Sequence, residues 1–330
     1  MEIAREHGAR VLEIPWPDDF AKARNHALDH VTGRWVLYVD ADERLQPTTR
    51  AEVERLLAPD DLLALSLGLR PTPGSTPYLE LRVWRNDPAI RFAGVIHEKV
   101  HPAILAVAER SGRRIADAPG LELVHVGYED DQERKHRRNL PLLERQLERE
   151  PDNVFNWRHL AEVREGLGDR PGAREALERA VALARAADEP DLHGAVAYSH
   201  LAEVLREDGE PVAELLREGR ARYPEDWMLV WLDARRKLDE GDPGAALPDL
   251  DALLSVEVPE LHGAISYDEA IFGALAHEAR GLALLRLGRP AEAAGAFARA
   301  EVLAPDAPAL KVKRRLAEAR AGLPGDRRSQ

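Results

Sequence analysis

The sequence predicts an α/β domain followed by an all-α array of helices, and two observations carry this prediction. In the first part of the chain, short apolar runs alternate with helical segments, a pattern typical of a sheet covered by helices. From Pro151 on, pairs of helices are separated at uneven intervals by the turn glycines Gly168, Gly209, Gly241 and Gly288. This repetition indicates a stacked helical array, and the uneven intervals predict spacer helices or turns.

Composition excludes several classes of protein. A chain of 330 residues is long enough for two domains, each with its own core. The absence of cysteine excludes disulfides, zinc thiolate sites and cysteine nucleophiles. A net charge of −13 argues against nucleic-acid binding. No apolar run approaches the roughly 20 residues that span a bilayer, and no signal peptide opens the chain. We therefore expect a protein of the cytoplasm or of the inner face of the membrane.

Three elements are expected before the main strand. Residues 2–7, 11–14 and 20–30 predict a helix, a strand and a second helix. Arg24 and Asn25 lie near the start of the second helix. Taken alone, they read as a solvated arginine and a neutral filler.

The segment from Trp35 to Glu43 is the one around which the first domain is organised. Its apolar run, residues 35–39, predicts a strand buried on both faces. Asp40, Asp42 and Glu43 follow at the carboxyl end of this strand, the edge where open α/β sheets bind ligands. Two aspartates separated by one residue can bind a hard cation such as Mg²⁺ or Mn²⁺ together with a substrate phosphate. The alternative is an acidic turn that only solubilises the strand end.

Further along the chain, three polar residues accompany predicted strands. A helix to about Leu57 is followed by strands at 62–69, 78–84 and 121–126. His97 and Glu98 lie between the last two strands, where Glu98 can act as a general base toward an attacking hydroxyl. The alternative is a surface glutamate beside a turn histidine. His125 lies in the last strand, where a lone histidine is more often a partly buried core residue than a metal ligand.

The second half of the chain predicts helices only. Residues 129–150 are predicted to form a charged helix, whose basic run 134–138 could meet phosphate or an anionic membrane surface, although its acidic neighbours favour a solvated face. Helix pairs from 151 to 322 cannot bury their apolar faces alone and must stack. Residues 323–330 are a mostly polar tail. The clearest unit places residues at the tetratricopeptide positions Gly281, Gly288, Ala293, Phe297, Ala300 and Pro305.

Four segments together carry a family resemblance. They are EIAREHGARV, IPWPDDFAKARNHALDHVTGRWVLYVDADE, RVWRNDPAIRFAGVIHEKV and LVHVGYEDDQERKHRRNLPLLERQLEREPDN. Their order resembles that of bacterial family 2 glycosyltransferases of the GT-A fold that carry C-terminal tetratricopeptide repeats. The resemblance covers residues 1 to about 150 and implies a GT-A domain, Rossmann-like and truncated at its amino end, over residues 1–128. A linking helix (129–150) and a tetratricopeptide superhelix (151–322) follow.

The resemblance also implies a role for each candidate residue. Asp40 and Asp42 would bind Mn²⁺ or Mg²⁺ and the diphosphate of a nucleotide-sugar donor. Arg24 and Asn25 would lie near the nucleotide. His97 would face the acceptor, and Glu98 would be the catalytic base. His125 would be a further metal contact.

The resemblance has one departure at the amino end. The family's first strand, which holds the nucleotide base, and the D-T-G-S-T-D-G-T-like segment that follows its second strand have no counterpart in the sequence. We therefore expect the chain as given to bind nucleotide sugars weakly.

Three classes of function follow. The first is a metal-dependent, inverting hexosyltransferase-like glycosyltransferase with a glycan, lipid-linked or protein acceptor. The second is a non-catalytic adaptor with a decayed transferase domain, whose repeats bind a protein partner. The repeats can equally serve only to stabilise the catalytic domain. The third is a phosphatase of the haloacid-dehalogenase type, but Glu43-Arg44 follow Asp42 where that class typically has x-T or x-V.

Overall fold

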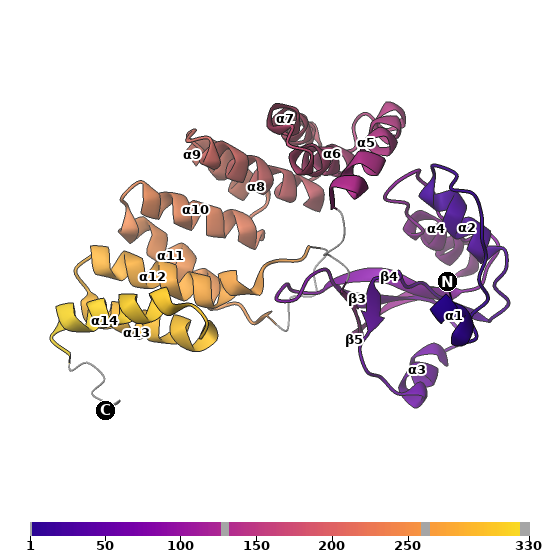
Figure 1. Ribbon diagram of the computed structural model, residues 1–330, viewed down its shortest axis with the longest axis horizontal. Coiled ribbons are helices and arrows are strands. Elements are labelled where there is room, and N and C mark those ends of the chain that lie inside the picture. Colours follow the sequence, from indigo (N-terminus) through magenta and orange to yellow (C-terminus); the bar gives the residue numbers. More distant parts are fainter. Residues whose placement is uncertain (1, 127–131, 259–264, 324–330) are drawn as a thin grey trace. The chain divides into compact units, whose positions relative to one another are not determined.

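The structure is a computed structural model that describes residues 2–126, 132–258 and 265–323 (Figure 1). It divides into two compact units. The first, here called the sheet unit, comprises residues 1–70 and 79–173. The second, here called the repeat unit, comprises residues 71–78 and 174–330. The predicted fold class, α/β followed by all-α, is confirmed.

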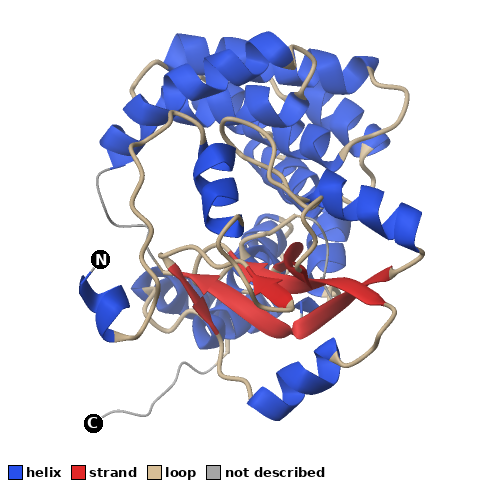
Figure 2. Ribbon diagram, turned by 90° about the vertical axis from the view of Figure 1, so that its right-hand side faces the viewer, coloured by secondary structure: helices blue, strands red, loops and turns tan. Residues whose placement is uncertain are grey.

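The sheet unit contains one mixed sheet, drawn in red in Figure 2. Its strands lie in the order β1-β4-β3-β5-β2, where β3 and β5 are parallel and the β1–β4 and β2–β5 pairs are antiparallel. The strand bounds are β1 (Trp35–Leu37), β2 (Glu43–Leu45), β3 (Leu62–Arg70), β4 (Tyr78–Arg85) and β5 (Arg114–His125). The strands predicted at 62–69, 78–84 and 121–126 are thereby confirmed, the last as the end of a longer strand.

Two strand predictions are wrong. β1 is not buried on both faces, since Leu37 is 47% exposed and Val39 is 39% exposed. The physical reason is that β1 is an edge strand of the described sheet and pairs with β4 alone. Residues 11–14 are apolar enough for a strand, but they have no ladder partner and form no regular element.

Capping residues determine where the helices of the sheet unit begin and end, and a shared hydrophobic core holds α2 and α4 against the sheet. The Asp19 side chain accepts a hydrogen bond from the Lys22 backbone over 2.9 Å and starts α2. Gly112, with a φ of 67°, ends α4. The helix bounds are α1 (Glu2–Glu6), α2 (Phe20–Leu28), α3 (Arg50–Leu57), α4 (His101–Ser111), α5 (Gln132–Arg149) and α6 (Val154–Gly166).

One face of the sheet packs on α2 and α4. Leu63 of β3 and Trp84 of β4 share a core cluster with Ala21 of α2 and with Ile104 and Val107 of α4. Each of these five side chains is at most 6% exposed, and burial of such apolar groups contributes about 1.5–3 kcal/mol for each large one. This core fixes α2 against the sheet and so fixes the helix that carries Arg24.

The repeat unit consists of helices joined by tight turns. The turn glycines Gly168, Gly209, Gly241 and Gly288 all have positive φ, between 71° and 83°, as predicted for helix C-termini. The helix bounds are α7 (Arg170–Ala186), α8 (Leu192–Glu207), α9 (Ala213–Arg222), α10 (Trp227–Asp239), α11 (Pro243–Leu254), η2 (Glu269–Phe272), α12 (Ala274–Arg286), α13 (Pro290–Leu303) and α14 (Pro308–Ala321).

Close helix packing in the last repeat explains its sequence pattern. A Cβ atom at Gly281 would lie 2.6 Å from the Phe297 ring, so α12 and α13 can approach this closely only with glycine at that position. The longest interval between turn glycines arises because η2 is inserted between α11 and α12. Gly322 ends α14 with a φ of 68°, and residues 324–330 of the predicted tail lie outside the described residues.

The compact units do not follow the domain bounds taken from the sequence. Helices α5 and α6 belong to the sheet unit, which extends to Ala173. Residues 71–78, between β3 and β4, belong to the repeat unit. Within the described part of the chain, no helix is long and apolar enough to cross a membrane.

Candidate active site

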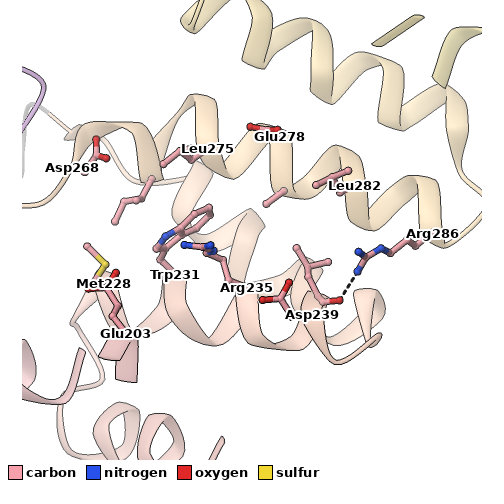
Figure 3. Close-up of a pocket in the computed structure, with 13 residues that line it drawn as sticks. Glu203, Met228, Trp231, Arg235, Asp239, Asp268, Leu275, Glu278, Leu282 and Arg286 are labelled. Atoms are coloured by element: carbon pink, nitrogen blue, oxygen red, sulfur yellow. Dashed lines mark hydrogen bonds between the residues drawn. The ribbon is translucent and has the colours of Figure 1, made fainter. Parts of the chain in front are cut away.

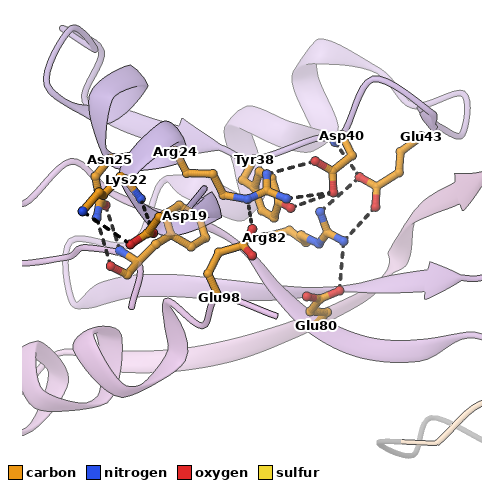
Figure 4. Close-up of polar contacts among 11 residues, drawn as sticks. Asp19, Lys22, Arg24, Asn25, Tyr38, Asp40, Glu43, Glu80, Arg82 and Glu98 are labelled. Carbon is orange, nitrogen blue, oxygen red and sulfur yellow. Dashed lines mark hydrogen bonds and ion pairs between the residues drawn. The ribbon is translucent and has the colours of Figure 1, made fainter. Parts of the chain in front are cut away.

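The candidate site lies where β1 ends, beside α2 (Figure 4). Arg24 of α2 joins two of the predicted acidic residues. Its Nη1 and Nη2 atoms donate to Asp40 Oδ1 and Oδ2 over 2.9 and 3.3 Å, and its Nε donates to Glu98 Oε1. One guanidinium therefore holds together a strand end, a helix and the loop that follows β4. The structure brings together three of the seven predicted site residues in this cluster.

Asp40 is held by a second neighbour, Tyr38. The Tyr38 hydroxyl donates to Asp40 Oδ2 over 2.7 Å, and the Arg24 guanidinium lies 4.2 Å from the centre of the Tyr38 ring. Burial raises the pKa of Asp40, but the hydrogen bonds from Arg24 and Tyr38 outweigh burial and leave this pKa below its ordinary value. Burial raises the pKa of Tyr38, so its hydroxyl stays a proton donor at neutral pH.

A second ion-pair cluster lies next to Asp40, and the sequence did not predict it. Glu43 accepts two hydrogen bonds from Arg82 of β4, over 2.8 and 3.0 Å, and its Oε2 also accepts from the Asp40 backbone over 2.8 Å. The side chains of Glu43 and Arg82 are only 2% and 4% exposed. Arg82 also donates to Glu80 over 3.0 Å. The third acid of the D-A-D-E run is thus an internal support for the turn that carries Asp40 and Asp42.

Asp42 and His125 form a separate pair at the same edge of the sheet. The Asp42 side chain is 42% exposed, and its Oδ2 lies 3.3 Å from His125 Nε2. The pairing of β2 with β5 brings these residues together, and the Val126 backbone donates to the Asp42 carbonyl over 2.7 Å. Among the described residues, no three or more histidine, cysteine, aspartate or glutamate side chains gather as a ready-made metal site.

The Asn25 side chain binds the protein backbone and does not point freely toward a ligand. Its side-chain amide donates to the Phe92 carbonyl over 2.9 Å and accepts from the Phe92 backbone N–H over 2.9 Å. This amide acts like one residue of a β-ladder and holds the loop after β4 against α2. Both of its polar atoms are used, so the structure does not direct them at a ligand.

The loop that carries His97 and Glu98 is a tight turn held at several points. Ala93 and Lys99 form a two-way backbone pairing, and Gly94 and His97 have positive φ values of 109° and 50°. A positive φ is uncommon for a residue other than glycine and persists where the surroundings hold it. The Glu98 side chain, which contacts Arg24, is 7% exposed.

Helix α6 supplies the surroundings that hold His97. The His97 ring stacks on the His159 ring, with centroids 4.0 Å apart, and meets the Phe155 ring edge-on at 5.1 Å. His159 Nδ1 lies 2.7 Å from Glu162 Oε2. Burial lowers the pKa of His97 and of His159, so both rings are neutral at pH 7. The structure thus places the predicted acceptor-side histidine against the first repeat helix, a contact that no local pattern in the sequence signals.

Comparison with known proteins supports the resemblance drawn from the sequence. Residues 1–86 match the family model for glycosyl transferase family 2. The matched region runs from α1 through β4 and includes Arg24, Asp40 and Asp42, whereas Glu98 and His125 lie beyond it. The first 86 residues are therefore similar to family 2 glycosyl transferases, and a series of helices lies beyond them.

The curated proteins similar to this chain include a repeat protein and a glycosyltransferase. The TPR repeat-containing protein Synpcc7942_0270 of Synechococcus elongatus is 33% identical over 214 residues, which cover 63% of this chain and 52% of that protein. The SPbeta prophage-derived glycosyltransferase SunS of Bacillus subtilis is 23% identical over 151 residues, which cover 42% of this chain and 33% of that protein. The chain thus spans about half the length of the first relative and a third of the second.

Solved structures of repeat proteins also align with the chain. The TPR protein YrrB gives a TM-score of 0.43 at 15% identity, covering 55% of this chain and 84% of that one. The MamA protein gives a TM-score of 0.39 at 17% identity, covering 59% and 90%.

Proposed function

We propose that this chain is a glycosyltransferase that moves a hexosyl group from a nucleotide-sugar donor to a glycan, lipid-linked or protein acceptor. The observation that carries the proposal is the convergence of Arg24, Asp40 and Glu98 at one sheet edge, in and beside the region that matches the transferase family. Ligands of α/β sheets bind at such edges. We place the activity in the cytoplasm or at the inner face of the membrane.

The diphosphate of the donor would be held at Asp42 and His125. A half-exposed carboxylate and an imidazole nitrogen 3.3 Å apart fit a divalent cation, and they leave other coordination positions for phosphate oxygens. Mn²⁺ or Mg²⁺ bound there would supply a Lewis acid that neutralises the leaving diphosphate. Asp40 already accepts hydrogen bonds from Arg24 and Tyr38. Its first role is therefore to orient Arg24, with any contact to metal being secondary.

Arg24 has the right chemistry to face the donor. A guanidinium presents a planar set of donors that matches phosphate oxygens, and it keeps its charge at any physiological pH. Asp40 and Glu98 hold this group from two sides, which fixes its orientation before donor binds. Asn25 would support the site through Phe92 and make no contact with the nucleotide.

Glu98 is the proposed general base. As the acceptor hydroxyl oxygen forms a bond with the anomeric carbon, the bond from that carbon to the diphosphate oxygen breaks, and the electron pair leaves with the diphosphate. The hydroxyl proton passes to the Glu98 carboxylate, whose second oxygen has no hydrogen bond to Arg24. One displacement of this kind inverts the anomeric configuration. His97 would hold the Glu98 loop toward the acceptor.

A non-catalytic adaptor is the second candidate function. The repeat unit contains a pocket of about 480 Å³, which favours a binding role for at least that unit. An adaptor would bind a protein partner and turn over no donor. Measuring donor turnover therefore distinguishes the two functions, whereas measuring binding does not.

Donor turnover tests the proposal directly. The full-length gene product would be incubated with a panel of nucleoside diphosphate sugars, with MnCl₂ or with excess chelator, and release of nucleoside diphosphate would be measured. We expect turnover that requires metal and is lost in Asp42→Asn. Asp60→Asn is a matched control, because Asp60 is a 97% exposed carboxylate of the same unit. Turnover that persists in chelator would refute the metal assignment, and absence of turnover with every donor would favour the adaptor.

A further inference from the structure

The repeat unit has a pocket that the transfer reaction does not use. Its volume is about 480 Å³, within the range of sites that hold a small ligand or one or two side chains. Helices α8, α10 and α12 and the inserted η2 line it. Figure 3 shows Trp231 and Arg235 of α10 opposite Leu275 and Leu282 of α12. Together with Ile271 of η2, these residues give the pocket an apolar lining with an aromatic ring.

The charges around this lining are mostly negative. Four carboxylates line the pocket, against two guanidinium groups. The two arginines have contacts of their own: Arg235 lies 5.7 Å from the centre of the Trp231 ring, and Arg286 donates to the Leu238 carbonyl. The four carboxylates are Glu203, Asp239, Asp268 and Glu278.

Two of the four carboxylates already have structural partners. Glu278 pairs with Lys313, and Asp268 accepts from the Ala270 backbone over 2.9 Å at the start of η2. Glu203 differs, because burial raises its pKa despite His200, Arg206 and Arg235 nearby. A further cation beside such a buried carboxylate would stabilise its ionised form. Asp239, at the end of α10, adds its charge to the negative end of that helix.

The wall formed by η2 is fixed by a loop from between two strands of the sheet. The Thr76 N–H donates to the Tyr267 carbonyl over 2.8 Å, and the Tyr267 N–H donates to Thr76 Oγ1 over 2.9 Å. The Glu269 N–H donates to the Gly74 carbonyl over 2.9 Å. Thr76 is fully buried. Loop 71–78 therefore holds the segment before η2 in an extended conformation, and the pocket wall is preformed.

We propose that this pocket binds a segment of a protein partner that presents an arginine or lysine beside large apolar side chains. The aliphatic groups would pack on Trp231 and Leu282, and the cation would face the carboxylates that line the pocket, among them Glu203 and Asp239. Such a segment complements both the apolar lining and the excess of carboxylates. This inference concerns the repeat unit alone and does not depend on sugar transfer.

Peptide binding to the full chain tests the inference. The probe is a fluorescein-labelled, amidated Gly-Leu-Arg-Leu-Gly-Ser peptide, followed by fluorescence anisotropy. Two comparison peptides replace the arginine with glutamate or both leucines with serine. We expect the arginine peptide to bind more tightly than both. The double variant Glu203→Gln/Asp239→Asn should weaken its binding by about tenfold, the loss expected when two charge interactions of up to about 1 kcal/mol are removed.

Controls separate the pocket from general attraction to an acidic chain. Glu292→Gln neutralises an exposed carboxylate of α13 outside the pocket, and it should leave binding unchanged. Equal affinity for the glutamate and arginine peptides, no binding of any peptide, or equal loss in the control variant would overturn the inference. N-acetylarginine amide binding as tightly as the peptide would also overturn it, because the occupant would then be a small cation. The peptide comparison uses the unaltered chain and so does not depend on how the variants fold.

Discussion

His97 stacks on His159, with ring centroids 4.0 Å apart and an angle of 28° between the rings. His97 belongs to the loop that carries the proposed base Glu98, and His159 belongs to α6, the first helix of the predicted repeats. The contact gives α6 a role in the sheet unit. The backbone N–H of Val95 adds to it by donating to Gln146 of α5 over 3.1 Å. The first helices after the sheet thus support the site, in addition to any binding role of the later repeats.

The stacked histidines predict a loss of stability in mild acid. Burial lowers the pKa of both rings, so the unfolded chain binds more protons than the folded one below about pH 6.5, the ordinary histidine pKa. The contribution of this neutral pair to the stability of the fold is fully present above that pH. It is lost as the pH falls toward the pKa values of the two histidines in the folded protein. The charged groups that face the pair are Lys99, Arg158 and Glu162. His159→Phe keeps a ring in the stack but cannot titrate.

Urea unfolding followed by tryptophan fluorescence checks this prediction. Between pH 7 and pH 5.5, the midpoint of the unaltered protein should fall, and it should fall less in His159→Phe. His7→Phe, which changes an exposed histidine, serves as the control and should keep the full pH dependence. An identical pH dependence in His159→Phe would show that the stacked pair is not its source.

The buried pair of Glu43 and Arg82 predicts a large and asymmetric mutational cost. Glu43→Gln removes one of the two carboxylates that form ion pairs with the buried Arg82 guanidinium among the described residues and leaves Glu80 as the other. Breaking a buried pair on one side typically costs about 3–5 kcal/mol. The double change Glu43→Met/Arg82→Met removes both charges and should cost less than Glu43→Gln.

Chemical denaturation of these variants is the measurement. Glu54→Gln breaks an exposed pair with Arg50 and should change the free energy of unfolding by at most about 0.5 kcal/mol. If Glu43→Gln is as mild as Glu54→Gln, the ion pair does not support the acidic turn.

Much of this architecture could be predicted from local sequence. The strands at 62–70 and 78–85 and the turn glycines follow from apolar runs and from the special backbone that helix ends require. The acidic turn at Asp40 and Asp42 was predicted because it follows a strand.

Contacts between distant segments could not be predicted in this way. β2 has only three residues, two of them charged, and exists because it pairs with β5. Arg82 reaches Glu43 only once β4 is in place, and Thr76 meets Tyr267 across 191 positions of sequence. Periodicity carries no information about such pairs, so the support of the site and the preformed wall of the pocket are structural findings.

The helical part of the chain should fold without the sheet. A fragment of residues 151–330 contains α6 through α14, and stacked repeats derive their stability from neighbouring helices. We expect a helical circular dichroism spectrum with a cooperative thermal transition. A random-coil spectrum would show that these helices do not fold without the sheet.

Glu98→Gln is the measurement that tests the central claim most directly. The substitution keeps the shape of the side chain and its hydrogen bond with Arg24, but removes its ability to take a proton. In the full-length protein, sugar transfer should fall by about 10²–10⁴, the usual value of general-base assistance, while donor affinity stays close to that of the parent. Transfer at close to the parent rate, or a parallel loss of donor affinity, would contradict the account, because Glu98 would then be a structural partner of Arg24 and not the base.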